Sequence, residues 1–131
     1  MINFFSKNKI FFYSANLILI FLYLFPGSFI GCILYNDCKI QPQILKDLLF
    51  LSFNHLFAFL LLSIIAWLTY SQNSKINLIF YYLIFLSIIL EILHILIPMR
   101  SFEWSDVFGN ILGVFIIFIT YEIFKKKNYK K

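Results

Sequence analysis

Four apolar runs, each close to the ~20 residues that a helix needs to cross a bilayer, constrain this chain more than any other feature. They cover residues 10–25, 48–70, 76–97 and 107–124. Hydrophobic residues make up 62% of the 131 residues and charged residues only 13%, which excludes an ordinary soluble domain. Lipid offers backbone groups no hydrogen-bonding partner, so each run is expected to be helical. The sequence predicts an all-α integral membrane bundle of about four transmembrane helices, in a single domain over residues 1–131.

Short segments that favour turns or bends separate these runs. Pro26-Gly27 is expected to end or kink the first helix. The turn SQNSK at residues 71–75 joins the second run to the third. Pro98 is expected to move Ile97 out of helical geometry and to close the third helix. No internal repeat and no soluble domain is visible between these boundaries.

The basic residues predict an orientation. Eight of the eleven precede the first run, lie between the second and third, or follow the fourth. They are Lys7, Lys9, Lys75, Lys125, Lys126, Lys127, Lys130 and Lys131. Lys39, Lys46 and Arg100 lie on the opposite side. The positive-inside rule then puts both termini in the cytoplasm and residues 29–46 and 99–105 outside. This topology also explains the net charge of +5, so no nucleic-acid partner is expected.

Both cysteines, Cys32 and Cys38, fall in the first outer loop. An oxidising compartment would allow them to pair, and the sequence leaves open whether they do. The segment FIGC at residues 29–32 also has some likeness to a secretory signal that ends in a lipidated cysteine. Phe29 is a poor residue three positions before such a cysteine, so a retained first helix is favoured.

Polar side chains from separate regions fall near one depth of the predicted bundle. With a rise of about 1.5 Å per residue, His55 lies about 10 Å inside the outer end of the second run, and Glu91 lies about 9 Å inside that of the third. One charge in the membrane costs about 2.5–3.5 kcal/mol on insertion scales, so such residues normally face partners or a wet cavity. The sequence therefore predicts an outward-facing pocket. Its expected ligand-binding residues are His55, Glu91, His94, Arg100, Asp106 and Asn110.

Structural roles compete with this interpretation. Asp106 can cap the fourth helix, and Asn110 can hydrogen-bond between helices. Gly109 and Gly113 have the GxxxG spacing of close helix packing. His55 can be a core histidine whose hydrogen bonds are satisfied. The coincidence of depth, rather than any one residue, favours a site.

Four further ionisable residues lie near the predicted outer side. Glu91 has no routine structural function inside an apolar helix, so it supports a site best. Arg100 is positioned to pair with Glu91 or Asp106, or to hold an anionic ligand. His94, near a helix end, can simply reach the interface. Glu103 is expected to be a solvated loop charge.

The spacing of these residues resembles that of the VanZ-like family, small membrane proteins named for a teicoplanin-resistance accessory protein. In that family, Glu-x-x-Gln is followed by Pro-x-Arg and then by Asp, Asn and Gly. The matching residues, within residues 54–113, are Glu91, Pro98, Arg100, Asp106, Asn110 and Gly113, preceded by NHLFAF with its histidine, His55. His94 replaces the family's glutamine, and Leu51-Ser52 replaces an Asp-Lys pair that many members carry. The resemblance implies a four-helix protein of the bacterial cytoplasmic membrane, sometimes tied to glycopeptide resistance, with no settled reaction.

Three functions remain open at this point. The pocket can bind an amphiphilic or anionic envelope ligand, such as a lipid-linked wall precursor or a glycopeptide. It can belong to an outer-leaflet enzyme with Glu91, Asp106 and His55 as acid/base candidates. The chain can also be a purely structural bundle in which a buried ion pair fixes helix register. A metal site formed by His55, His94, Glu91 and Asp106 matches no established ligand spacing, so neither a metal nor a cofactor is predicted.

A transporter is disfavoured. The polar residues are concentrated in one leaflet instead of the midplane, and no inverted repeat is evident.

Overall fold

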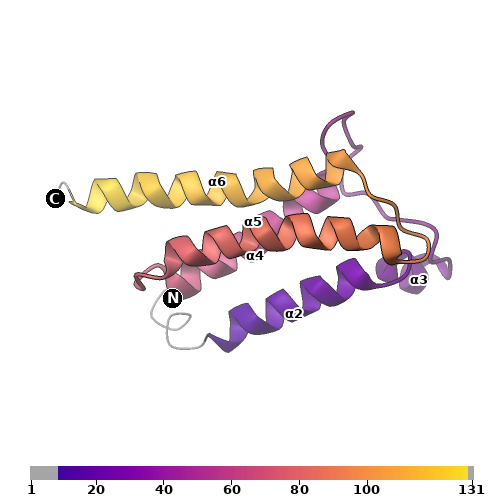
Figure 1. Ribbon diagram of the computed structural model, residues 1–131, viewed down its shortest axis with the longest axis horizontal. Coiled ribbons are helices and arrows are strands. Elements are labelled where there is room, and N and C mark those ends of the chain that lie inside the picture. The colour runs from indigo at the N-terminus through magenta and orange to yellow at the C-terminus, as the bar shows by residue number, and fades with distance from the viewer. Residues whose placement is uncertain (1–8, 130–131) are drawn as a thin grey trace.

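A computed structural model describes residues 9–129, and within them every regular element is a helix (Figure 1). The elements are α2 (Ile10–Leu24), α3 (Phe29–Tyr35), α4 (Phe53–Tyr70), α5 (Ile76–Leu93), the short 3₁₀-helix η1 (His94–Leu96) and α6 (Trp104–Tyr129). Three segments, Phe53–Tyr70, Ile76–Leu96 and Trp104–Lys127, are long and apolar enough to cross a membrane. The bent pair α2 and α3 makes a fourth if it counts as one span. The all-helical class and the multi-span character predicted from the apolar runs are confirmed.

The first predicted bend lies between α2 and α3, whose axes differ by 76°. Gly27 takes a φ of +70°, a left-handed conformation that favours glycine. The side chain of Ser28 then accepts a hydrogen bond from the Gly31 N–H at 3.0 Å, which caps α3. Pro26-Gly27 therefore ends α2 as predicted, whereas α3, inside the expected outer loop, was not anticipated.

The predicted start of the second span is wrong by five residues. Leu48 and Leu51 exchange two backbone hydrogen bonds in a tight turn, and α4 begins only at Phe53. The carboxylate of Asp47 accepts the Phe53 N–H at 2.8 Å, which satisfies a donor at the helix N-terminus. Apolar composition alone could not separate this turn from the helix that follows it.

The ends of the other two spans depart less from expectation. Ile97 is extended, with φ −98° and ψ 128°, so Pro98 closes the third span as predicted. The fourth helix begins three residues before the predicted position 107 and continues five residues beyond position 124. It therefore includes Lys125–Lys127, whose long side chains can reach polar surroundings from a helix end. Lys7, Lys130 and Lys131, used in the orientation argument, lie outside the described residues.

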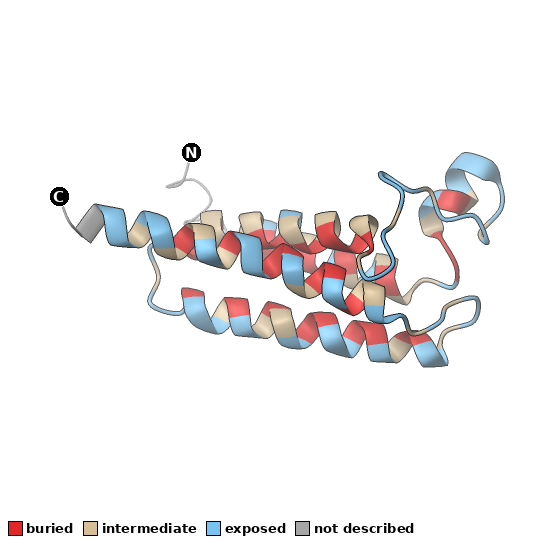
Figure 2. Cartoon of the chain, turned by 90° about the horizontal axis from the view of Figure 1, so that it is seen from above, coloured by how far each residue is buried: buried red, intermediate tan, exposed pale blue. Residues whose placement is uncertain are grey.

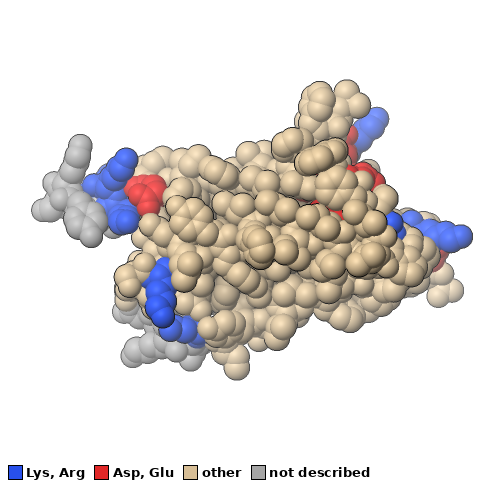
Figure 3. All heavy atoms as spheres, viewed as in Figure 1, with Lys and Arg blue, Asp and Glu red and all other residues tan. Residues whose placement is uncertain are grey.

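The helices run roughly along one axis. The start of α2, the 71–75 turn and the end of α6 lie at one end, while α3 and the loops that precede α4 and α6 lie at the other (Figure 1). Buried residues occupy the facing sides of the helices and exposed residues the outer sides (Figure 2). On the face shown in Figure 3, charged atoms gather at the two ends with a broad uncharged band between them. Large apolar side chains are exposed on all four long helices, including Leu17 on α2, Leu61 on α4, Phe85 on α5 and Ile119 on α6. This pattern suits lipid rather than water around the bundle.

The closest helix packing is between α4 and α6, where two glycines face α4. A Cβ atom at Gly109 would lie 2.5 Å from the Ser52 carbonyl oxygen. A Cβ atom at Gly113 would lie 2.5 Å from the Leu56 carbonyl oxygen and 2.8 Å from the Leu60 nitrogen. The absence of side chains at these positions lets the two backbones approach, as the GxxxG spacing predicted. This approach brings the first turn of α6 against the first turn of α4.

Candidate functional site

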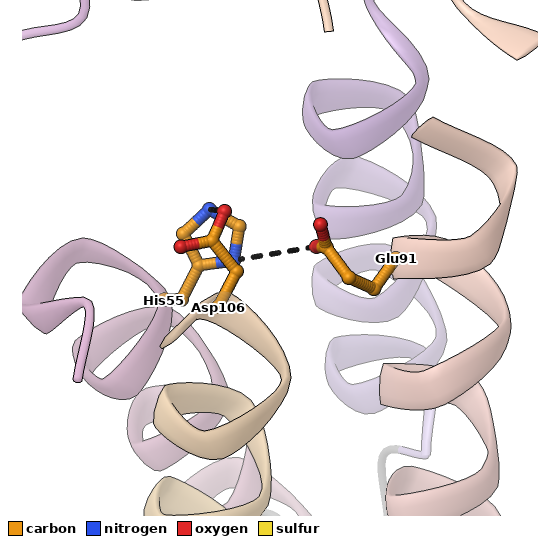
Figure 4. Close-up of side chains that lie close together, drawn as sticks. All are labelled: His55, Glu91 and Asp106. Atoms are coloured by element: carbon orange, nitrogen blue, oxygen red, sulfur yellow. Dashed lines mark ion pairs between the residues drawn. The ribbon is translucent and has the colours of Figure 1, made fainter. Parts of the chain in front are cut away.

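The structure brings four ionisable side chains from three helical segments together at the α3 end of the bundle. His55 comes from α4, Glu91 and His94 from the end of α5 and η1, and Asp106 from the first turn of α6. Figure 4 shows the carboxylates of Glu91 and Asp106 directed toward the His55 ring. We refer to these four residues as the polar cluster. The predicted convergence of these distant residues therefore occurs.

The distances within the polar cluster are short. His55 Nε2 lies 3.2 Å from Asp106 Oδ2, and His55 Nδ1 lies 4.0 Å from Glu91 Oε2. His94 Nδ1 lies 3.1 Å from the same Glu91 oxygen. His55, Glu91 and His94 are buried, with 5%, 0% and 1% of their surface exposed. Only the Asp106 side chain, 15% exposed, has appreciable contact with the outside of the protein.

Glu91 uses its two carboxylate oxygens differently. Oε1 accepts a hydrogen bond from the backbone N–H of Glu103 at 3.0 Å, just before α6 begins. A carboxylate there is favoured by the partial positive charge of the helix N-terminus. Oε2 faces the two histidines and makes no hydrogen bond within residues 9–129. Glu91 thus has a structural function that sequence analysis did not assign, and its other oxygen contacts the two histidine rings.

His94 is held by the backbone of α2 rather than placed at the membrane interface. Its Nε2 lies 3.0 Å from the carbonyl oxygen of Tyr23. A carbonyl only accepts hydrogen bonds, so Nε2 carries the hydrogen. Nδ1 is the ring nitrogen that faces Glu91. The alternative in which His94 only reaches the interface is therefore wrong.

Tyr23 joins the polar cluster to α2 and was missed in the sequence. Its hydroxyl donates a hydrogen bond to Asn110 Oδ1 at 2.7 Å, and its ring contacts those of His55 and His94. Tyr23 follows Asn16 by seven residues on the buried stripe of α2. A tyrosine in phase with an asparagine inside an apolar run was the available signal, because buried Tyr hydroxyls need partners.

Asn110 does make the hydrogen bond between helices that its position suggested, through its contact with Tyr23. The residue is fully buried, and its Nδ2 has no hydrogen-bond partner in the described part of the chain. Glu103, in contrast, is exposed and its side chain accepts a hydrogen bond from Ser101, in keeping with a loop charge.

Arg100 makes different contacts from those expected. Its Nη2 donates to the carbonyl oxygen of Leu22 at 3.2 Å and its Nε to that of Phe25 at 3.4 Å. The guanidinium therefore binds the carbonyl end of α2, where a cation is favoured. Within residues 9–129 no ion pair joins Arg100 to Glu91 or Asp106, so that alternative is wrong. Burial lowers the pKa of Arg100 from its ordinary value, yet an arginine of this kind stays charged at neutral pH.

A cavity of about 470 Å³ adjoins the polar cluster between α2, α3 and α4. We call it the α2–α4 cavity. His55, Tyr23 and Arg100 form part of its wall. Much of the remaining wall is apolar and includes Leu22, Phe29, Ile30, Ile44, Phe57, Ala58 and Leu61. Of the six predicted ligand-binding residues, His55 and Arg100 are in the wall of this mainly apolar cavity, whereas Glu91, His94, Asp106 and Asn110 are not.

The two cysteines join α3 to the loop that follows it. Cys32, on α3, forms a disulfide with Cys38 in the following loop. The Cys38 carbonyl also accepts the Ser28 N–H at 2.7 Å. The question that the sequence left open is answered by this pairing, which holds α3 against the loop beside the cavity.

Comparisons of the chain with family models, with curated proteins and with solved structures find no match. The VanZ-like resemblance therefore stays a prediction supported by the residues themselves.

Proposed function

We propose that this chain is a VanZ-like, multi-pass protein of the bacterial cytoplasmic membrane that binds an amphiphilic, anionic envelope ligand in the α2–α4 cavity. The observation that carries the proposal is the composition of the cavity wall. Phe57, Ala58 and Leu61 offer an apolar surface for a lipid chain, while Arg100 offers hydrogen-bond donors in the same wall. A lipid-linked wall precursor has this division into a long apolar chain and a phosphate.

The contacts of Arg100 support a role in holding the anionic group. A guanidinium has five N–H donors, and the Leu22 and Phe25 carbonyls engage two of its nitrogens. These contacts fix the orientation of the side chain at the cavity wall and leave further donors for a phosphate or carboxylate. A preorganised arginine loses less conformational entropy when it binds an anion.

The proposed orientation puts both termini in the cytoplasm and the α2–α4 cavity near the outer surface. Two independent features support it. The count of basic residues assigns residues 29–46 to the outside. The disulfide between Cys32 and Cys38 lies in the same segment, and disulfides form and persist in oxidising compartments.

Thermal unfolding of the detergent-solubilised protein tests ligand binding. Undecaprenyl phosphate is expected to raise the unfolding temperature, whereas undecaprenol, with the same chain and no phosphate, is expected to raise it less. Ala58→Phe, which fills the cavity, should remove the shift, and Leu112→Phe on the exposed side of α6 is the matched control. An equal shift in Ala58→Phe and Leu112→Phe would contradict binding in the cavity.

A cellular test addresses the link to glycopeptides. Expression of the protein in a susceptible Gram-positive host is expected to raise the minimal inhibitory concentration of teicoplanin, and Arg100→Ala is expected to remove the increase. The wild-type protein and Arg100→Ala must be present in the membrane at equal levels for this comparison. If every variant that loses the phenotype also loses folded protein, the structural alternative is favoured.

The pair of His55 and Asp106 favours a second candidate, an enzyme that acts on a lipid-linked substrate. A carboxylate 3.2 Å from Nε2 can orient an imidazole, and Nδ1 has no hydrogen bond among the described residues. This arrangement is typical of a general base and its orienting partner. Comparison of envelope lipids from cells with the wild-type protein and with His55→Gln distinguishes the two functions. A modification that depends on His55 would indicate chemistry, and identical lipids would indicate binding.

A further inference from the structure

We propose that the polar cluster binds one divalent transition-metal ion, with zinc as the best fit. Three of its residues, His55, Glu91 and Asp106, each offer a ligand atom, and these atoms lie within 4.8 Å of one another. His94 Nδ1, 3.1 Å from Glu91 Oε2, offers a fourth. This inference goes beyond the proposed function, because a metal site here does not require that the α2–α4 cavity holds a lipid.

Two buried atoms that make no hydrogen bond give the first argument. Neither His55 Nδ1 nor Glu91 Oε2 has a hydrogen-bond partner in residues 9–129, and both residues are at least nine-tenths buried. A buried polar atom without a partner costs about 1–3 kcal/mol. The two atoms face each other across 4.0 Å (Figure 4). A cation between them would satisfy both.

The proton positions on His94 give the second argument. The Tyr23 carbonyl requires the hydrogen on Nε2, so neutral His94 presents a lone pair at Nδ1. An ionised Glu91 presents a lone pair at Oε2, and the two atoms are 3.1 Å apart. Two acceptors at this distance repel each other unless a positive charge lies between them. That charge is either a shared proton or a metal ion.

The contacts behind the ligand atoms give the third argument. Metal-binding histidines commonly donate their other ring N–H to a backbone carbonyl or a carboxylate, and ligand carboxylates are themselves hydrogen-bonded. His94 does this through Tyr23, and Glu91 does it through the Glu103 N–H. Both contacts hold a ring or carboxylate in place and leave one atom directed at the cluster.

The donor set selects the class of metal. Two imidazoles with two carboxylates suit zinc and similar first-row ions, while calcium and magnesium prefer oxygen ligands alone. Ligand atoms on a tetrahedral zinc ion lie about 3.4 Å apart, given bonds of about 2.0–2.2 Å. The separations of 3.1 and 4.0 Å join Glu91 to the two histidines and are near this value, so small side-chain rotations would bring these three ligands onto one ion. The carboxylate of Asp106 lies 3.2 Å from the other ring nitrogen of His55, where it would hold that ring, and it would need a larger rotation to supply the fourth ligand.

Metal analysis of the purified full-length protein tests the proposal. After treatment with a chelator, loading with zinc and removal of unbound metal, wild-type protein is expected to retain about one zinc ion per chain. Glu91→Gln and His94→Ala should retain less than about one tenth of this amount. Glu122→Gln is the matched control. It makes the same change on α6, at the end of that helix away from the polar cluster, and should retain zinc. Retention by all variants, or by none of the proteins, would overturn the proposal.

A measurement on the unmodified protein covers the case in which a variant fails to fold. Cobalt loaded in place of zinc is expected to show the intense visible absorption of a tetrahedral ion with nitrogen and oxygen ligands, reversed by added zinc. The weak spectrum of octahedral cobalt would contradict the site. Lipid-induced thermal shifts measured with and without chelator separate this proposal from the proposed function, because lipid binding in stripped protein would leave the cavity proposal intact.

Discussion

The Oε1 atom of Glu91 and the backbone N–H of Glu103 are joined by a hydrogen bond of 3.0 Å. A carboxylate within an apolar helix thereby fixes the loop that leads into α6. The same residue directs Oε2 at two histidines, so its structural and chemical functions are divided between two oxygens. This division makes it possible to separate the two functions by substitution.

Glu91→Ala and Glu91→Gln should differ in stability. Alanine leaves the Glu103 N–H without its acceptor, which is expected to lower the free energy of unfolding by about 1–3 kcal/mol. The amide oxygen of glutamine can still accept this hydrogen bond, so Glu91→Gln is expected to lose less than the alanine variant. Reversible unfolding in mixed detergent micelles measures both values. Equal losses would show that the contact with Glu103 does not stabilise the fold.

Gly113→Leu should disrupt the packing of α4 on α6. Even a Cβ atom at this position would lie 2.5 Å from the Leu56 carbonyl, so the helices must separate. Overpacking of this kind costs about 1–3 kcal/mol, and here it would also move Asp106 away from His55. Unfolding in micelles measures the loss. Leu112→Val, at the neighbouring exposed position, controls for a generic change on α6 and should have little effect.

The parts of the fold that could be predicted are those that depend on local sequence. Lipid forces apolar runs into helices, so residues 53–70 and 76–96 were recoverable from composition, and Pro98 marked a helix end directly. The pair Gly109 and Gly113 indicated close packing. The turn at 48–51 was not recoverable, because its leucines resemble a helix in composition and the hydrogen bonds that define it depend on three-dimensional contacts.

The candidate site could likewise be predicted only in part. Depth along each helix follows from residue number once the helix ends are known. The convergence of His55, Glu91 and Asp106 could be expected, but the depth of His55 was overestimated, because α4 begins at Phe53 and not at residue 48. The rotation of each helix and the choice of partners depend on packing. Arg100 therefore donates hydrogen bonds to carbonyl oxygens at the end of α2, 75 and 78 residues away in sequence, and not to an acidic side chain. The partner of Tyr23, Asn110, lies 87 residues away and could not be identified for the same reason.

The hydrogen bond between Tyr23 and Asn110 should be measurable as a coupling energy. In membrane proteins such contacts contribute about 0.6 kcal/mol on average and up to about 1.7 kcal/mol. Because it is buried and only 2.7 Å long, this hydrogen bond is expected in the upper half of that range. A double-mutant cycle of Tyr23→Phe and Asn110→Leu in micelles provides the value. A coupling indistinguishable from zero would mean that the two side chains act independently.

Cysteine labelling tests the disulfide and the orientation together. If Cys32 and Cys38 are paired outside the cytoplasm, a membrane-impermeant maleimide should label neither residue in intact cells until an impermeant phosphine reductant is added. Both thiols should then react, because their segment lies outside the membrane barrier. Single cysteines placed at Ser71 and at Glu122, in the Cys32→Ser/Cys38→Ser background, are the matched controls for the opposite side. They should react only after the membrane is permeabilised. Labelling of Ser71→Cys in intact cells, with protection of the native pair even after reduction, would reverse the proposed topology and place the α2–α4 cavity near the cytoplasm.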